Sequence, residues 1–356
     1  MSPTGQVVAA APPEGVEVFS PANPHELSGY LKEATSSGTR VAIWGGGTHR
    51  DIGYDGAFDV VVSTSRITGI EEWVPDDLTV VVRSGTPVAE LEAELNSGGQ
   101  TAILPEQPGQ ATVGGVVATG VSGYARLRYG PTRDRILEVQ AVTGDGRQIK
   151  GGGRVVKNVT GYDLPRLYAG SFGALGIITS VCLKLWPLTE VSATVFLDEV
   201  PSQEAIYRPR AVLQTPEGVR VLLSGTEREV ADIAGRLGGE QRPGLHLPDP
   251  VTGPTVWSAR VTPSLLSQTV GRFPPGTPYV AQHGVGEVTF VAEDELFVAA
   301  LRSWVEETGG AVVRMRGQSD LDPWGTPPST LELQRRIVAA FDPARILERG
   351  RLPGGL

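Results

Sequence analysis

The chain has 356 residues, of which 40% are hydrophobic and 20% charged, a composition typical of a globular protein with more than one core. Its formal net charge of −9 argues against a nucleic-acid partner, which would require a basic face. The single cysteine excludes disulfides within the chain and an iron–sulfur cluster ligated by this chain alone, and it favours a reducing, cytoplasmic setting.

The N-terminal residues 1–14 lack a cationic start followed by an apolar stretch of signal-peptide length, and we expect a flexible tail there. No apolar run in the sequence approaches the length of a membrane-spanning helix. We therefore expect no direct membrane insertion, and membrane contact only through a complex.

Residues 15–104 predict a first α+β unit. A helix is predicted at 21–38, where Leu27 and Leu31 share one face, Asn23 or His25 can begin it and Gly38 can end it. The remaining elements of this unit are expected at 39–44, 58–67 and 78–85 (strands) and at 87–99 (a helix).

Three consecutive glycines, Gly45, Gly46 and Gly47, follow the first of these strands and precede Thr48 and His49. The spacing fits neither the G-x-G-x-x-G dinucleotide pattern nor the P-loop pattern, and no helical periodicity follows it. Two interpretations stay open from the loop alone: an ordinary tight turn, or a concave loop whose backbone N–H groups surround a phosphate.

A second unit is predicted at 105–187, and it contains two further glycine clusters. The first carries Gly109, Gly114, Gly115, Gly120 and Gly123 with small residues between them. Such a backbone can pack against a flat, extended ligand, because side chains there would block its approach. Three separated clusters favour the ligand-binding interpretation over three independent turns.

Shorter sequence patterns predict the elements in the rest of the second unit and in the region after it. A hairpin is predicted around Asp145-Gly146, followed by a closing strand within 173–187. Beyond residue 187 the pattern is less regular, with a strand expected at 219–225 and helices expected at 228–239 and 294–310.

The segments "VAIWGGGTH", "ATVGGVVATGVSG", "GGRVVKNVTGYDLPRLYAGSFGALGIITSVCLKLWP" and "AFDPARILERGRL" occur in this order. Together they resemble the FAD-binding domain of the vanillyl-alcohol oxidase (PCMH-type) flavoprotein superfamily, and within it the smaller FAD-binding subunit of glycolate oxidase complexes. The resemblance is strong over about residues 20–187, weak over 188–330, and returns near 341–352. Glu348-Arg349 stands where the family usually carries Asn-Pro, so the terminal loop is expected to run differently.

This resemblance implies an α+β fold with three parts. A PCMH-type FAD-binding domain is expected at 15–187, made of α+β subdomains at about 15–104 and 105–187. A smaller α/β cap domain, on the substrate side, is expected at 188–330. A C-terminal helix and loop at 331–356 are expected to pack back on the FAD domain.

The resemblance also implies a cleft for FAD. Some relatives attach the flavin through a histidine directly after a glycine pair. Thr48 stands at that position here and His49 comes one residue later, so we expect a non-covalent FAD. The residues implied to bind the cofactor are Trp44, Gly45, Gly46, Gly47, Thr48, His49, Thr112, Val113, Gly114, Gly115, Gly120, Gly123, Lys157, Gly161, Tyr162, Asp163, Gly173 and Ile178.

Flavin oxidation of a small 2-hydroxy acid needs a base for the hydroxyl proton and a cation for the carboxylate. The candidates are His283, Lys157 and Arg128, although each can equally be an ordinary polar or ion-paired residue. The large catalytic subunits of the family are recognised by clustered histidines and acids in their second domain, and this sequence has no such cluster. No metal site is expected.

Three functions follow from the resemblance. The first is the FAD-binding subunit of a glycolate (2-hydroxy-acid) oxidase complex, with a catalytic FAD subunit and an iron–sulfur subunit as partners. The second is a self-sufficient FAD-dependent D-2-hydroxy-acid dehydrogenase, and the third is a non-catalytic assembly subunit. The missing histidine cluster and the scarcity of cysteine both favour dependence on partners.

Overall fold

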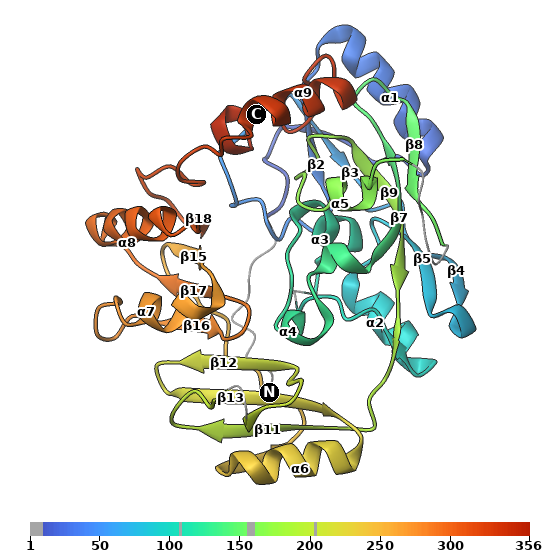
Figure 1. Ribbon diagram of the computed structural model, residues 1–356. Coiled ribbons are helices and arrows are strands. Elements are labelled where there is room, and N and C mark those ends of the chain that lie inside the picture. Colours follow the sequence, from blue (N-terminus) through green and yellow to red (C-terminus); the bar gives the residue numbers. More distant parts are fainter. Residues whose placement is uncertain (1–9, 107–108, 155–160, 203–204) are drawn as a thin grey trace.

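The computed structural model describes residues 10–106, 109–154, 161–202 and 205–356 (Figure 1). The described strands form four sheets, with three, two, eight and five members. The mixed α+β class expected from the sequence is confirmed. None of the helices in the described ranges is long and apolar enough to cross a membrane.

The three-stranded sheet is parallel and carries one long helix. Helix α1 (Pro24–Ser37) begins as predicted at Asn23, whose side chain accepts backbone N–H bonds, and it ends at Gly38, which has φ 72°. Leu27 and Leu31 are buried in the core that this helix shares with the sheet. The strands, in spatial order, are β1 (Glu17–Phe19), β3 (Val60–Ser63) and β2 (Val41–Trp44).

The five-stranded sheet is antiparallel throughout and contains the largest core. In spatial order its strands are β4 (Ile70–Val74), β5 (Thr79–Arg83), β9 (Ile177–Lys184), β7 (Ile136–Val142) and β8 (Gln148–Gly152). The elements around it are α2 (Val88–Ser97), β6 (Gln100–Thr101), α3 (Val113–Thr119), α4 (Arg126–Tyr129), α5 (Leu164–Tyr168) and β10 (Trp186–Pro187).

The strand pairing corrects the subdomain boundary expected at residue 104. Strand β5 lies in the expected first unit, but it pairs along its whole length with β9, from Thr79↔Lys184 to Arg83↔Ser180. Its inward residues Val80 and Val82 belong to the large core rather than to the core under α1. The two sheets of the domain therefore separate between residues 63 and 70.

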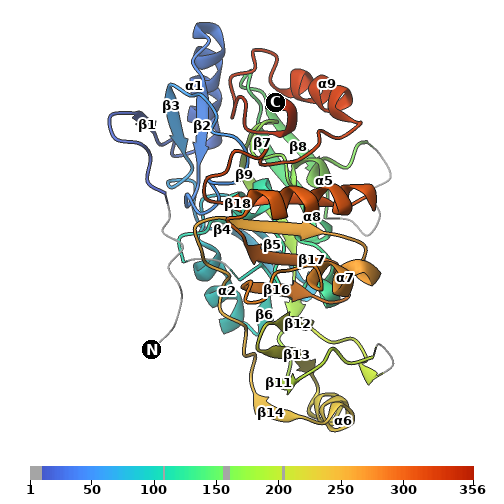
Figure 2. The ribbon, with the colours of Figure 1, turned by 90° about the vertical axis from the view of Figure 1, so that its left-hand side faces the viewer.

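Residues 191–316 supply one continuous eight-stranded sheet, the cap sheet, whose order can be followed in Figures 1 and 2 together. Every pairing in it is antiparallel, so the expectation of an α/β cap is wrong: helices join some of its consecutive strands, but no two neighbouring strands run parallel. The expected helices 228–239 and 294–310 are confirmed as α6 and α8, and the strand at 219–225 as β13.

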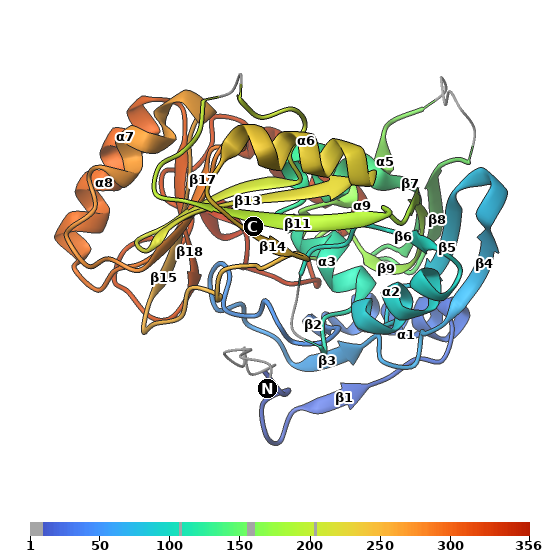
Figure 3. The same cartoon turned by 90° about the horizontal axis from the view of Figure 1, so that it is seen from below.

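The cap helices lie on the outer face of the cap sheet, and the other face turns toward α3 and α4 (Figures 1 and 3). In spatial order the cap strands are β14 (Glu240–Pro243), β11 (Val191–Leu197), β13 (Gly218–Gly225), β12 (Ala211–Thr215), β16 (Tyr279–Gln282), β17 (Glu287–Val291), β15 (Val256–Arg260) and β18 (Ala311–Arg316). The helices are α6 (Glu227–Leu237), α7 (Leu266–Val270) and α8 (Glu295–Glu307).

Both ends of the chain contact the three-stranded sheet and the loop after β2. After α9 (Leu331–Phe341), Leu347 forms a parallel bridge with Val41 at the edge of β2. At the other end, the N–H of Ala10 donates to the carbonyl of Gly47 at 3.1 Å. The expectation of a free tail over 1–14 therefore does not hold at Ala10, while residues 1–9 lie outside the described ranges.

Substitution of the α1 cap should weaken the fold measurably. The Asn23 side chain accepts hydrogen bonds from the N–H groups of His25 and Glu26, both at 3.0 Å. We predict that Asn23→Ala lowers the free energy of unfolding by about 1 kcal/mol, measured by chemical denaturation. The control is Asn96→Ala in α2, an exposed helical asparagine that should cost nothing; equal losses in both variants would contradict the capping role.

Candidate cofactor-binding site

A cleft of about 650 Å³, open space at its mouth included, lies where the three-stranded sheet, α3, the start of β9 and the C-terminal loop meet. The residues that line this cofactor cleft are Ile43, Gly45, Gly46, Gly47, Thr48, His49, Arg50, Thr64, Ser84, Thr112, Gly114, Gly115, Ala118, Thr119, Phe172, Gly173, Gly176, Ile177, Ile178, Glu348 and Arg351.

The glycine loop, residues 45–50, forms one wall by packing closely against the second glycine cluster. A Cβ atom at Gly46 would overlap the backbone carbonyl of Gln110, and one at Gly45 would overlap the hydroxyl of Thr112. Gly45 and Gly46 thus have a packing role beside the one expected toward a ligand. They let two stretches of backbone approach each other, and the cleft wall is what this contact creates.

The same wall presents hydrogen-bond donors. The backbone N–H groups of Gly46, Gly47 and Thr48 donate to no other group in the described part of the chain. Opposite them, the hydroxyl of Thr112 accepts the N–H of Gly115 at 3.2 Å and so fixes the first turn of α3. Successive free amides in a concave loop suit a phosphate group, so the donor set fits the diphosphate of a dinucleotide.

The facing wall is largely apolar and includes residues that the sequence did not single out. Phe172, with φ 51°, turns the chain before β9, and Ile177 and Ile178 begin that strand. Ala118 adds the inner face of α3. A narrow cleft with an amide-rich wall and an apolar wall can hold a ligand that is polar in one part and flat and aromatic in another.

The third wall carries charge, and sequence patterns gave no signal for it. Arg50 and Arg351 both pair with Glu348, at 2.6 and 3.3 Å. Near them, burial lowers the pKa of His49 to about 4, and the positive charges of Arg351 and Arg316 lower it further in the same direction. His49 is therefore neutral at pH 7, with its Nδ1 2.9 Å from the hydroxyl of Thr48.

Ten of the expected cofactor residues lie together in the cleft. They come from three separate stretches of the chain, 45–49, 112–115 and 173–178. These ten are Gly45, Gly46, Gly47, Thr48, His49, Thr112, Gly114, Gly115, Gly173 and Ile178.

Seven others lie outside the lining, for local reasons. Trp44 points to the back of the loop and donates to Ala10, Val113 is fully buried in the large core, and Asp163 caps α5. Tyr162, beside Gly161, is 92% exposed. Gly120 ends α3 and Gly123 packs on Pro105, while Lys157 lies outside the described residues.

The expected catalytic side chains are engaged elsewhere. His283 shares a 2.8 Å hydrogen bond with Gln214 inside the cap sheet, and burial lowers its pKa. Arg128 in α4 donates to the backbone carbonyl of Ser224 in β13. This hydrogen bond joins the cap sheet to the domain that contains the cleft. Neither residue lines the cleft, so their roles in catalysis stay predictions.

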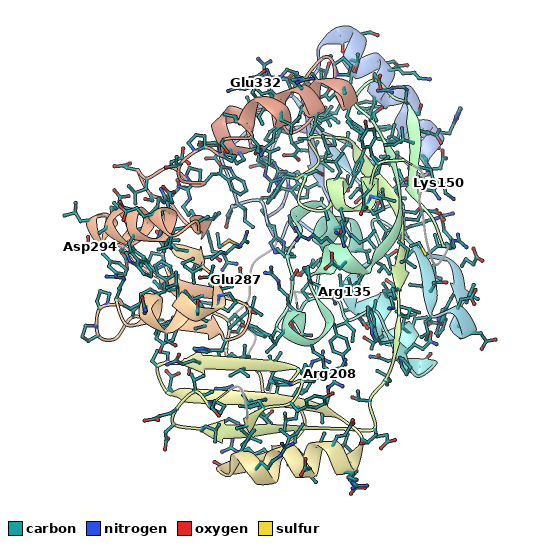
Figure 4. The ribbon with its side chains drawn as sticks, viewed as in Figure 1. Arg135, Lys150, Arg208, Glu287, Asp294 and Glu332 are labelled. Atoms are coloured by element: carbon teal, nitrogen blue, oxygen red, sulfur yellow. The ribbon has the colours of Figure 1, made fainter. Side chains whose placement is uncertain are left out.

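A second charged contact joins the cap to α4. Arg126 lies 3.3 Å from Glu287, whose side chain in β17 lies between the cap and the domain with α4 (Figure 4). Leu127 packs beside Gly284 in the turn before β17. The cap is therefore docked through α4, a few residues beyond the part of α3 that lines the cleft.

This arrangement defines a dinucleotide-binding domain, and comparison with known proteins agrees. Residues 17–152 match the family model described as "FAD binding domain". The chain is 36% identical over 186 residues to glycolate oxidase subunit GlcE of Escherichia coli, covering 49% of this chain and 53% of that protein. It is 31% identical over 241 residues to a D-lactate dehydrogenase of Archaeoglobus fulgidus, covering 67% of this chain and 53% of that protein.

A solved structure of alkyldihydroxyacetonephosphate synthase matches with a TM-score of 0.64 over 93% of this chain and 75% of that one, at 16% identity, which shows a shared fold. Residues 17–152 therefore form an FAD-binding domain like that of the PCMH-type, or vanillyl-alcohol oxidase, flavoproteins. The resemblance inferred from the sequence is confirmed. The chain spans about half the length of the curated relatives just named, 53% in both cases.

We predict that Gly46→Ala disrupts the loop even without a ligand. The added methyl group would overlap the Gln110 carbonyl, and relieving such a contact costs about 1–3 kcal/mol. The expected result is a lower midpoint of thermal unfolding together with loss of flavin. Gly109→Ala is the control, because a Cβ there would have no atom within 4 Å; a Gly46→Ala protein as stable as this control would contradict the close contact.

The low pKa of His49 predicts a pH dependence of stability. Between pH 6.5, the ordinary histidine value, and about 4, the unfolded chain binds a proton that the native chain does not, so stability falls as the pH falls through this window. The loss contributed by His49 is about 3 kcal/mol at most. His49→Gln should flatten the difference between unfolding at pH 7 and pH 4.5, whereas His25→Gln, at an exposed position, should not.

Proposed function

We propose that this chain is the FAD-binding subunit of a glycolate (2-hydroxy-acid) oxidase complex and takes part in flavin-mediated oxidation or electron transfer. The observation that supports this most is the meeting of distant stretches of chain around one cleft, whose glycine loop has backbone amides without a partner among the described residues. The 36% identity to a glycolate oxidase subunit points to the complex.

In this proposal different residues of the cleft bind different parts of the cofactor. The amides of Gly46, Gly47 and Thr48 hold the diphosphate, and the apolar wall with Ile177 and Ile178 faces the flat ring. When bound, FAD supplies an acceptor for two electrons that can be passed on one at a time. The chain's own part is to bind and orient the cofactor and to exclude water from it.

The cofactor is proposed to be non-covalent. Thr48 lies directly after the glycines, and the neighbouring His49 ring is half-buried and directed to the Thr48 hydroxyl. The proposed partners are a catalytic FAD subunit and an iron–sulfur subunit. A partner that supplies the catalytic base and the cation for the carboxylate is consistent with the hydrogen bonds that engage His283 and Arg128 away from the cleft. The proposed location is the cytoplasm, with membrane contact only through the complex.

One observation favours a second candidate, a self-sufficient D-2-hydroxy-acid dehydrogenase. The similarity to the archaeal D-lactate dehydrogenase extends over 241 residues of this chain, further than the 186 residues matched by the glycolate oxidase subunit. The third candidate, a non-catalytic assembly subunit, differs from both in needing no flavin.

The experiment is the visible spectrum of the purified chain, followed by anaerobic addition of glycolate or D-lactate without any partner. We expect flavin absorption bands, a yellow supernatant after acid precipitation, and no bleaching by either acid. Bleaching by D-lactate would favour the self-sufficient dehydrogenase over the subunit of a complex. A chain that neither carries nor takes up FAD would be an assembly protein, and colour left in the acid pellet would show a covalent flavin.

A further inference from the structure

Two arginines and one glutamate form a buried charge network along one wall of the cofactor cleft. Arg50 Nη1 lies 2.6 Å from Glu348 Oε1, and Arg351 Nη1 lies 3.3 Å from Glu348 Oε2. The side chains of Glu348, Arg351 and Arg50 are 2%, 6% and 15% exposed. All three residues line the cleft.

The geometry of this network is fixed on every side. Glu348 Oε1 also accepts the backbone N–H of Ile43 at 2.6 Å, which ties it to β2. The Arg50 guanidinium lies over the Trp44 ring at 4.5 Å from its centroid, and that of Arg351 lies over Phe172 at 5.2 Å. Stacking and ion pairing together hold a planar cation in one orientation.

Arg351 uses Nε and both terminal nitrogens in hydrogen bonds to the protein, whereas Arg50 uses only one terminal nitrogen. The Nε and Nη2 groups of Arg351 donate to the backbone carbonyls of Ile52 and His49. Arg50 uses only Nη1, for Glu348 and the carbonyl of Ile43, and its Nε and Nη2 donate to no other group in the described ranges. Arg50 therefore has donors to spare at the wall of the cleft.

The network carries one positive charge more than it balances. Two guanidinium groups face one carboxylate, and His49 adds no charge at pH 7 because its pKa is about 4. Asp51, the next acid along the loop, is 57% exposed and lies 3.8 Å from Arg316. Its charge offsets that of Arg351 only in part, because burial still lowers the pKa of the Arg351 guanidinium. A cation largely removed from water is unfavourable without a counter-charge, so this wall favours an anion in the cleft.

We propose that Arg50 is the side-chain cation that binds the diphosphate of the dinucleotide, and that Glu348 is the positioning residue that aims it. The inference rests on the proposed FAD-binding function. The diphosphate is favoured over a substrate carboxylate because Arg50 belongs to the same short loop as the free amides of Gly46, Gly47 and Thr48. The residue that aims Arg50 comes from the far end of the chain, 298 positions away.

The test is calorimetric titration of the full chain freed of flavin, with ADP as the diphosphate probe and riboflavin and glycolate as the other two. For Arg50→Gln we expect a roughly 10- to 100-fold weaker affinity for ADP and an unchanged affinity for riboflavin. Arg50→Lys, which keeps the charge but not the fork, should lie between. Arg316→Gln is the matched control, a nearby arginine outside the cleft lining, and should bind ADP like the wild type.

Glu348→Gln separates positioning from simple charge. Removing a negative charge beside an anion site should tighten ADP binding if Glu348 only neutralises Arg50. A positioning role predicts weaker ADP binding instead, because the ion pair that holds the guanidinium is lost while riboflavin binding persists. Tighter ADP binding by this variant would overturn the assignment of Glu348.

The remaining outcomes are also decisive. Arg50→Gln with wild-type affinity for ADP would overturn the inference alone, provided that the wild type binds FAD. Loss of glycolate affinity only would move the cation to the substrate. A wild-type chain that binds neither FAD nor ADP would end the proposed function and this inference together. Thermal unfolding without ligand checks that each variant is folded, and Arg50→Lys keeps the test valid if Arg50→Gln is not.

Discussion

The contact between two stretches of backbone, the glycine loop after β2 and the segment before α3, is the constraint on which the rest of the site depends. At Gly46 the two backbone segments are too close to leave room for any side chain, so the loop cannot shift without opening the cleft. The contact joins the parallel sheet to the helix that packs on the antiparallel sheet. It therefore fixes the relative position of two walls that have no strand pairing in common.

The third wall depends on the contact of the C-terminal loop with β2 and the loop that follows it. The C-terminal loop adds Leu347 to the edge of β2, and this bridge delivers Glu348 to Arg50. Glu348 has φ 42°, a left-handed backbone conformation that a non-glycine residue adopts only where its surroundings enforce it. Glu348, the first residue of the pair that departs from the family pattern, is thus part of the site. A cofactor held by this wall would in turn stabilise the docked C-terminal loop, by mass action.

The sequence predicts those features that local chemistry determines. Helix α1 begins and ends as predicted because Asn23 and Gly38 act within one turn. The pairing of β5 with β9 was missed because register between strands a hundred residues apart has no local signal. The Arg50–Glu348 pair was missed for the same reason. Family motifs placed ten residues in the cleft, but they also included neighbours such as Tyr162 that point to solvent.

Different parts of the molecule support the inferences about the cofactor and about the substrate. The inference of a dinucleotide depends on backbone geometry, which is retained when side chains change. A substrate is selected by side chains, and the family resemblance is weakest in the cap, whose sheet meets the domain through Arg126, Leu127 and Arg128 of α4. Helix α4 follows the cleft-lining helix α3 by only a few residues, so the contact with the cap lies close in the chain to the cofactor wall. The docking of the cap through α4 is therefore the place where substrate choice and cofactor binding can become coupled.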